Sequence, residues 1–142
     1  MYKYAGFFVM ALLMCFFVPQ TASAWDLHNG SNSKVGAIDS DGTVRAANSA
    51  IIGKISSSGA VHNKSNSKVG QIESDGRIKG RNGSQVGKID LSDGRVFNGS
   101  NSQIGKIDSS GTVYNGSNSR IGSARGVPRA WAAVFFFFND FN

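Results

Sequence analysis

The chain has 142 residues, and its 15 Lys and Arg against 9 Asp and Glu give a net charge of +6. A chain of this length forms one small domain. The single cysteine, Cys15, excludes an intrachain disulfide, and two His leave few ligands for a metal and few groups for acid-base catalysis. No set of nucleophile, base and acid recurs, so the sequence predicts a protein without catalytic residues, metal or cofactor.

The first 24 residues are typical of a secretory signal peptide. Lys3 gives a positive start, residues 5–18 are an apolar run, and Ala22-Ser23-Ala24 is a small-x-small cleavage site. The run of about 14 residues is shorter than the roughly 20 that a membrane-spanning helix needs. We therefore predict that residues 1–24 are cleaved. The mature chain is then exported, and in a bacterium it is periplasmic, extracellular or associated with the outer membrane.

Residues 25–127 contain six copies of a repeat built around an apolar residue followed by Gly. Successive pairs are 17 residues apart, with one spacing of 18. The six pairs are Val35-Gly36, Ile52-Gly53, Val69-Gly70, Val86-Gly87, Ile104-Gly105 and Ile121-Gly122. Each repeat also holds two polar turn segments, such as residues 29–33 and 39–42. This pattern predicts two strands of about four residues in every repeat.

The turn residues and the repeated Gly each suggest a backbone conformation. Asn29-Gly30 supplies the positive φ of a tight hairpin, and Gly42 suits a left-handed position that closes the second turn. Val35 and Ile38 are separated by an odd number of residues, so strict alternation would place them on opposite faces. Gly36 predicts a bulge that lets both face inward.

The segment from Asp39 to Gly42 also resembles the start of a calcium-binding loop. The equivalent residues 56–59 carry no carboxylate, and residues 108–111 carry one. A calcium-binding repeat would conserve its carboxylates from copy to copy, so turn formation is the favoured interpretation.

The six repeats predict an all-β fold, a closed ring or shallow barrel of about twelve short antiparallel strands. Residues 25–28 and 121–124 each lack a partner within their own repeat. Pairing these two segments would close the sheet and remove the edges at which sheets aggregate.

Residues 128–142 are chemically unlike the repeats, because residues 130–138 are apolar throughout. Four consecutive Phe are compatible with a buried strand, but Pro128 and the alanines that follow favour a helix. A helix without a polar face is buried, and the interior of the barrel is the place for it. The residues predicted to form this plug are Trp131, Val134, Phe135, Phe136 and Phe137.

This arrangement, short Asn-Gly-Ser-Asn-Ser hairpins followed by a Phe-rich end, resembles the β-flower proteins. Those are shallow rings of hairpins around a central hydrophobic helix, and they resemble in turn the Tubby C-terminal barrel and the phospholipid scramblases. The resemblance covers residues 25–142 and implies association with lipid or membrane, with no catalysis. No motif of this chain matches the phosphoinositide-binding residues of Tubby.

Positive charges recur beside the apolar-Gly pairs, and these could attract anionic lipid or simply keep the outer face solvated. We predict a lipid-binding or membrane-peripheral protein that uses these cations and Phe side chains protruding from one mouth of the barrel. Export and the scarcity of stacking aromatics in the repeats argue against nucleic acid as a partner. The alternative is a structural or adhesive module that binds a polymer such as glycan. The predicted contact residues are Phe138, Phe141, Lys34, Lys54, Lys68, Lys88, Lys106 and Arg120.

Overall fold

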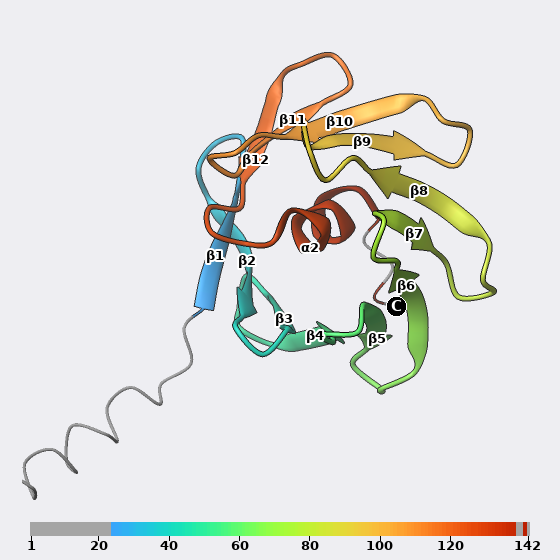
Figure 1. Cartoon of the computed structure of the whole chain (residues 1–142). Helices are drawn as coiled ribbons and strands as arrows, with labels where there is room; N and C mark the ends of the chain where they lie inside the picture. Colours follow the sequence, from blue (N-terminus) through green and yellow to red (C-terminus); the bar gives the residue numbers. More distant parts are fainter. Residues whose placement is uncertain (1–23, 139–140, 142) are drawn as a thin grey trace, which may run out of the picture.

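The computed structural model describes residues 24–138 and 141 of the chain. Within them, twelve antiparallel strands form one closed barrel around a short helix, which confirms the predicted fold (Figure 1). The predicted signal peptide lies outside the described residues except for its last residue, Ala24. The strands are β1 (Ala24–Asn29), β2 (Lys34–Asp39), β3 (Thr43–Ala46), β4 (Ile51–Ile55), β5 (Ala60–Asn63), β6 (Lys68–Ile72), β7 (Arg77–Lys79), β8 (Gln85–Ile89), β9 (Arg95–Asn98), β10 (Gln103–Ile107), β11 (Thr112–Asn115) and β12 (Arg120–Ser123).

The barrel is closed by the first and last strands, as predicted. His28 of β1 lies opposite Ser123 of β12, and Asn29 lies opposite Gly122. All remaining pairings join strands that are consecutive in the chain, so the strand order around the barrel is the chain order. The sheet therefore has no free edge strand among the described residues.

A bulge at each apolar-Gly pair confirms the predicted role of the glycine. In the first repeat Leu27 lies opposite Gly36, whereas the next residue, His28, lies opposite Lys34. Val35 is thus the extra residue of the bulge. The same register shift occurs in the other five repeats. The bulge keeps Gly36 on the inner face with Leu27 and directs Lys34 to the outer face with His28.

The hairpin tips are closed by Asn side chains, and here one prediction is wrong. Positive φ occurs at Asn32 (67°) and not at Gly30. The Oδ1 atom of Asn29 accepts hydrogen bonds from the backbone N–H groups of Ser31 and Ser33, at 2.9 and 3.0 Å. This local bonding sets the turn, so the left-handed position falls on the second Asn, a residue that tolerates it. The equivalent residues with positive φ are Ser49, Asn66, Gly83, Asn101 and Asn118.

The turns at the other end of the barrel follow the prediction, with a glycine in the left-handed conformation. Gly42 has a φ of 94°, and its carbonyl oxygen accepts a hydrogen bond from the N–H of Ile55 in the next repeat, at 2.8 Å. Equivalent bonds at 2.7–2.9 Å join each later turn glycine to the following repeat. These turns therefore connect neighbouring repeats as well as consecutive strands.

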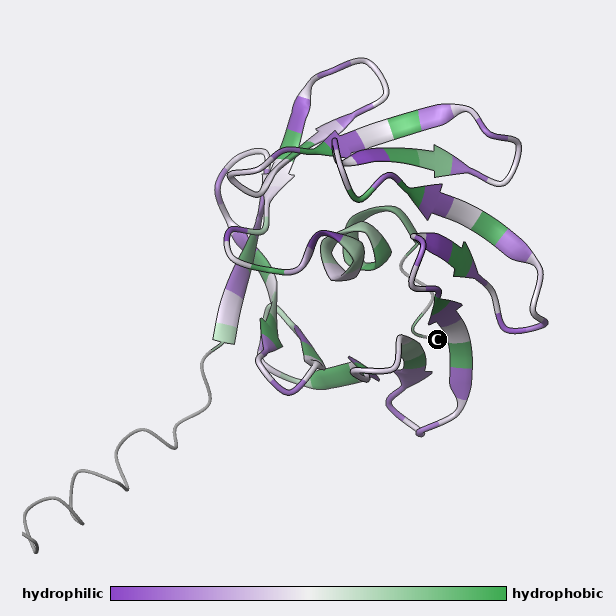
Figure 2. Cartoon of the chain, viewed as in Figure 1, coloured by the Kyte–Doolittle hydropathy of each residue, from purple (hydrophilic) through white to green (hydrophobic). Residues whose placement is uncertain are grey.

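The core consists of one to three buried aliphatic side chains from every strand pair, packed around the C-terminal helix. Figure 2 shows this hydrophobic helix inside the ring of strands. The largest side chains at 1% exposure or less are Leu27, Ile38, Val44, Ile55, Val69, Ile89, Val96, Ile107 and Val113. Such a thin core depends on its central element, because each repeat alone buries too little apolar surface to be stable.

The C-terminal segment is helical, as favoured from the sequence, but only its first turn is an α-helix. Helix α2 (Arg129–Ala133) follows Pro128 and continues as a π-helix, η2 (Val134–Phe138). Ala132 and Ala133 are fully buried, and Val134 is 3% exposed. No helix within residues 24–138 is long and apolar enough to cross a membrane.

Candidate functional site

Six glycines form a ring on the inner wall of the barrel, and we call them the ring glycines. Each is the second residue of an apolar-Gly pair, and the bulge beside it holds it on the inner face. The absence of a side chain leaves six equivalent recesses that face the central helix. The ring glycines are Gly36, Gly53, Gly70, Gly87, Gly105 and Gly122.

Five of the six recesses are filled by phenylalanine rings of the C-terminal segment. A Cβ atom built on Gly36 would lie 2.8 Å from Cζ of Phe135, so the edge of the ring rests directly on the glycine backbone. Any side chain at this position would collide with the ring. The other pairs are Phe136 with Gly122, Phe137 with Gly105, Phe138 with Gly87 and Phe141 with Gly53.

The π-helix distributes the rings around the barrel in order. Phe135 faces β2, and the three Phe residues that follow face β12, β10 and β8 in turn. Consecutive residues thus reach consecutive ring glycines. A π-helix has a wider turn than an α-helix, and π segments are frequent at functional sites. The Phe run is therefore a radial set of side chains and not a one-sided stripe.

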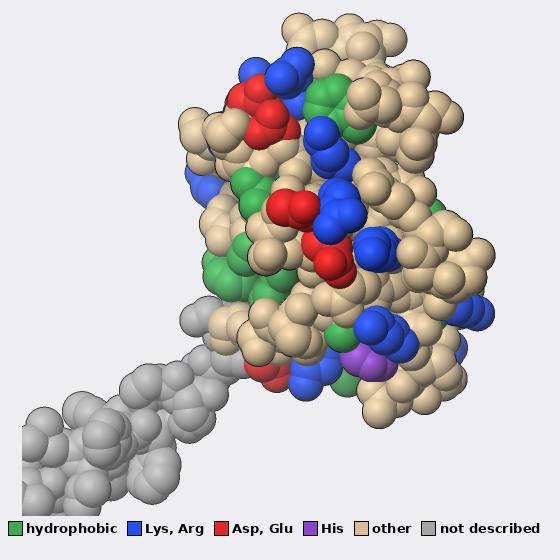
Figure 3. All heavy atoms as spheres, turned by 45° about the vertical axis from the view of Figure 1, so that its right-hand side comes forward, with side chains coloured by type: hydrophobic (Ala, Val, Ile, Leu, Met, Phe, Trp, Pro, Cys, Tyr) green, Lys and Arg blue, Asp and Glu red, His purple; other side chains and the backbone are tan. Residues whose placement is uncertain are grey.

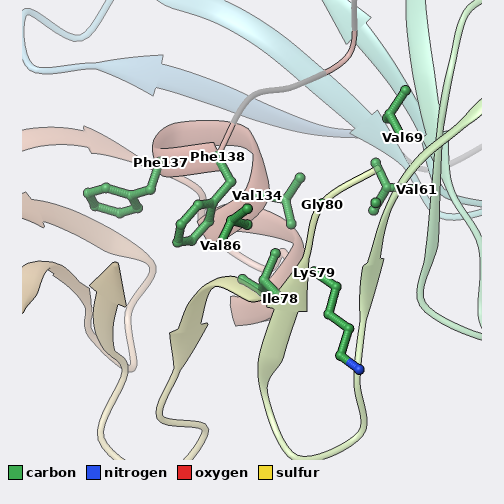
Figure 4. A pocket seen from close by; sticks show the side chains of 10 residues that line it. Val61, Val69, Ile78, Lys79, Gly80, Val86, Val134, Phe137 and Phe138 are labelled. Atoms are coloured by element: carbon green, nitrogen blue, oxygen red, sulfur yellow. The ribbon is translucent and has the colours of Figure 1, made fainter. Parts of the chain in front are cut away.

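The sixth recess, at Gly70, receives no phenylalanine. A Cβ built on Gly70 would meet only the carbonyl oxygen of Lys79, at 2.9 Å, and the side chain of Val61, at 3.7 Å. A cavity of about 350 Å³ lies here, and we call it the open slot (Figure 4). The apolar side chains that line it are Val61, Val69, Ile78, Val86, Val134, Phe137 and Phe138.

The open slot is apolar and reaches the surface. Val86, at its rim, is 40% exposed, and Phe138 is partly exposed. Lys79 lines the slot as well, but Figure 4 shows its amine pointing away from Phe138. Val69 is only 1% exposed, whereas the equivalent residues of the other repeats are all partly exposed. The slot therefore differs from the other recesses in its packing and has no charged group directed into it among the described residues.

Partly exposed apolar side chains line the inside of the barrel mouth around the Phe rings, and we call them the flower face. Phe138, predicted to contact lipid, belongs to it. Phe141 does not: it is 6% exposed and packs on Gly53, so the prediction that it protrudes is wrong. Phe136 and Phe137, predicted as plug residues, fill recesses but remain partly exposed. The flower face consists of Phe136, Phe137, Phe138, Val35, Ile52, Val86, Ile104 and Ile121.

The six predicted cationic contact residues share the outer wall and do not lie beside Phe138. Lys34 lies opposite His28, and Lys54 lies opposite His62. Both His residues follow an inward-facing residue in their strands, so these pairs face outward. The other four, Lys68, Lys88, Lys106 and Arg120, lie opposite outward-facing residues in the same way. The sheet thus separates the cations from the flower face. The bulge has this effect, because it changes the alternation that simple residue spacing suggests.

Several outer-wall cations have partners. Lys34 Nζ is 3.3 Å from Asp26 Oδ1, and Lys88 Nζ is 5.4 Å from the ring centroid of Phe97. Figure 3 shows Lys and Arg side chains in a band on the wall, with Asp and Glu next to them. Such exposed pairs contribute little stability, so the net charge remains available for long-range attraction.

Carboxylates of the glycine turns accept backbone hydrogen bonds, as at Asp41 and Asp75. The N–H of Thr43 donates to Asp41 Oδ1 at 3.0 Å and lowers the pKa of Asp41, and the N–H of Arg77 likewise lowers the pKa of Asp75. No three His, Cys, Asp or Glu gather at a potential metal site in the part of the chain that the structure describes. This geometry matches the interpretation of these segments as turns.

The open slot was missed from the sequence, although a signal for it was present. Six apolar-Gly pairs stand in the repeats, but only five Phe follow Pro128. If the glycines had been known to face the Phe rings, this difference of one would have indicated a recess without a ring. Their pairing depends on the π-helix, which sequence periodicity did not reveal.

A model of one protein family, described as "5-fold beta-flower protein", matches residues 24–140. The match confirms the resemblance noted from the hairpin repeats and the Phe-rich end. The described residues of this chain form six hairpins, where the family's description names a five-fold arrangement. Comparisons with curated proteins and with solved structures gave no significant match.

Proposed function

This chain belongs to the β-flower protein family, and on that basis we propose that it is an exported, non-enzymatic protein that attaches to lipid membranes through its flower face. One observation carries the proposal, the partial exposure of Phe136, Phe137 and Phe138 at the mouth of the barrel. These rings rest on the ring glycines at one edge and are partly exposed to solvent.

Aromatic and aliphatic side chains on such a face favour the boundary between head groups and acyl chains. The outer-wall cations add an attraction to anionic lipid of about 1 kcal/mol for each charge near the surface. Because the sheet separates these cations from the flower face, we propose that they attract the protein to the membrane over a distance and do not contact lipid directly. Attraction of this kind weakens as salt shortens the Debye length to about 10 Å at 0.1 M.

A second candidate is the binding of a polymer such as glycan on the outer wall. It is favoured by two outward aromatic residues with cationic neighbours. Phe97 has Lys88 at 5.4 Å and Arg95 at 5.5 Å from its ring centroid, and Tyr114 lies opposite Lys106 in the sheet. Aromatic faces with polar groups at their rim suit sugar rings, but only two of the six repeats carry them.

Cosedimentation with vesicles tests the proposal. We expect binding to vesicles that contain phosphatidylglycerol, less binding to pure phosphatidylcholine, and weakening by salt. Val86→Asp places a charge on the flower face, and Ile51→Asp places the same charge on the outer wall at a residue of similar exposure, 51% against 40%. Ile51 lies opposite Arg45, on the outer side. The Val86 variant is expected to bind vesicles at least tenfold more weakly and the Ile51 variant nearly as well as the unmodified protein. Equal loss in both variants, or no binding at low salt, would refute attachment through the flower face.

A further inference from the structure

We propose that the open slot at Gly70 is a binding site for a ligand that presents a single phenyl ring. The inference goes beyond membrane attachment and does not depend on it. It rests on a comparison within the molecule. Five equivalent recesses each hold a phenylalanine ring, and this indicates the kind of group that fits the sixth.

The recess at Gly70 is built like the other five. Gly70 lies opposite Val61, as Gly36 lies opposite Leu27, and a bulge follows at the next position in both repeats. Its Cα is therefore presented to the interior in the same way as the others. In four of the other recesses the distal edge of a phenyl ring rests on that glycine, and at Gly53 the side of the Phe141 ring does so. The shape that the repeat generates is thus a phenyl-sized recess with a backbone floor.

The chain has no aromatic residue of its C-terminal segment left for this recess. All five Phe of residues 129–142 rest on other ring glycines. Trp131, the remaining aromatic residue of the segment, packs against Trp25 with 6.3 Å between ring centroids. A sixth ring must therefore come from outside the C-terminal segment.

Size and chemistry agree with this occupant. An apolar cavity of about 150 Å³ is sufficient for benzene, and the open slot measures about 350 Å³. Its walls include aliphatic side chains and the rings of Phe137 and Phe138, with which an incoming ring can pack edge to face. Since the amine of Lys79 points away, the part of the ligand that enters is uncharged.

The slot also has an entrance from solvent. Val86 and Phe138 border it and are exposed to solvent in part. A ligand can therefore carry a polar substituent that remains outside while its ring is buried. This distinguishes the slot from a closed packing defect in the core.

Titration of the whole mature protein with benzyl alcohol, followed by methyl and amide NMR shifts, is the direct test. We expect saturable shifts at Val61, Val69, Gly70 and Ile78, with small shifts near Gly122, the ring glycine that Phe136 covers. 1-Heptanol has the same number of carbons in a flexible chain, and we expect it to bind at least fivefold more weakly. Tighter binding of heptanol would make the slot an acyl-chain site and overturn the proposal, as would shifts that do not saturate or that map elsewhere.

Two variants separate filling of the slot from general damage. Val69→Phe adds a ring beside Gly70 and is expected to abolish the benzyl alcohol shifts. Val35→Phe makes the same change beside Gly36, where Phe135 already fills the recess, and is expected to leave binding within twofold of the unmodified protein. Unchanged binding in Val69→Phe would contradict the assignment. If this variant does not fold, the titration of the unmodified protein decides alone.

N-Acetyl-phenylalanine amide distinguishes two sources of the ring. Tighter binding of this capped residue than of benzyl alcohol assigns the slot to a phenylalanine side chain of a protein partner, and weaker binding assigns it to a small aromatic molecule. No vesicles are present in these titrations, so failure of ring binding and failure of membrane attachment are observed separately.

Discussion

Trp25 of β1 and Trp131 of α2 meet edge to face, with ring centroids 6.3 Å apart and an interplanar angle of 70°. The contact joins the first strand of the barrel to the helix that ends the chain. Gly126 also lies against Trp25, where a Cβ would be 2.9 Å from the indole Cδ1. This cluster therefore holds the entry of the C-terminal segment into the barrel.

We expect Trp131→Ala to lower the free energy of unfolding by about 2–3 kcal/mol, at the lower end for aromatic truncation because the ring is only partly buried. Urea unfolding followed by circular dichroism measures this. Trp131→Phe, which keeps a ring against Trp25, serves as the control and is expected to lose less than half as much. Equal losses in both variants would show that the edge-to-face contact is unimportant.

Two glycine substitutions test the difference between a filled recess and the open slot. In Gly87→Ala the new methyl group collides with the ring of Phe138 and with the carbonyl of Phe97, and in Gly70→Ala it meets only the carbonyl of Lys79. We expect Gly87→Ala to lower the free energy of unfolding by about 3 kcal/mol or to unfold the protein, and Gly70→Ala to lower it by about 1 kcal/mol. Overpacking of a core typically costs about 1–3 kcal/mol. Thermal melts of the two variants side by side give the comparison, and a larger loss at Gly70 would contradict the assignment of the open slot.

Removal of residues 128–142 is expected to abolish folding, because the aliphatic inner wall loses its central partner. The buried Ala132, Ala133, Val134 and Phe135 would all be absent, and apolar burial contributes about 25 cal/mol per Å². A truncation after Phe138 removes only one ring, that of Phe141, and is expected to fold with reduced stability. If the variant that lacks residues 128–142 keeps a cooperative melt and a native circular dichroism spectrum, folding does not depend on the plug.

Stability is expected to fall in acid because of the turn carboxylates. The backbone N–H of Thr43 lowers the pKa of Asp41, and that of Arg77 lowers the pKa of Asp75. A carboxyl whose pKa is lower in the folded state stabilises the fold above its unfolded pKa, about 4, and the contribution disappears as pH falls through the folded pKa. Urea midpoints between pH 6 and pH 2 measure the effect. The double variant Asp41→Asn, Asp75→Asn is expected to show a flatter decline below pH 4, and an identical decline would exclude these two groups as its source.

The repeat period was sufficient to predict most of the fold. The spacing of Val35-Gly36 and its copies indicated two strands and a bulge per repeat, and the unpaired ends indicated closure between β1 and β12. These features are local or follow from counting strands. The helical plug also followed from local composition, since residues 130–138 have no polar face.

The candidate site was less predictable, because it depends on contacts between distant residues. Burial of Phe141 requires the chain to return to Gly53, which hydrophobicity alone does not indicate. The position of Lys34 on the outer wall depends on which residue of the bulge is extra. At the hairpin tips, Asn29 and Asn32 share a turn in which side-chain bonding decides where the positive φ falls. Both Gly30 and Asn32 are residues that tolerate positive φ, so residue preference alone does not decide between them.

The plug follows all twelve strands in the sequence, and this order limits when the barrel can form. The ribosome produces all twelve strands before it produces Phe135 to Phe138, and β1 waits for β12 before the sheet can close. A nascent chain therefore has no closed sheet until β12 has been made, and no filled interior until the Phe run that follows β12 has been made as well. The barrel can form only after both segments have left the ribosome.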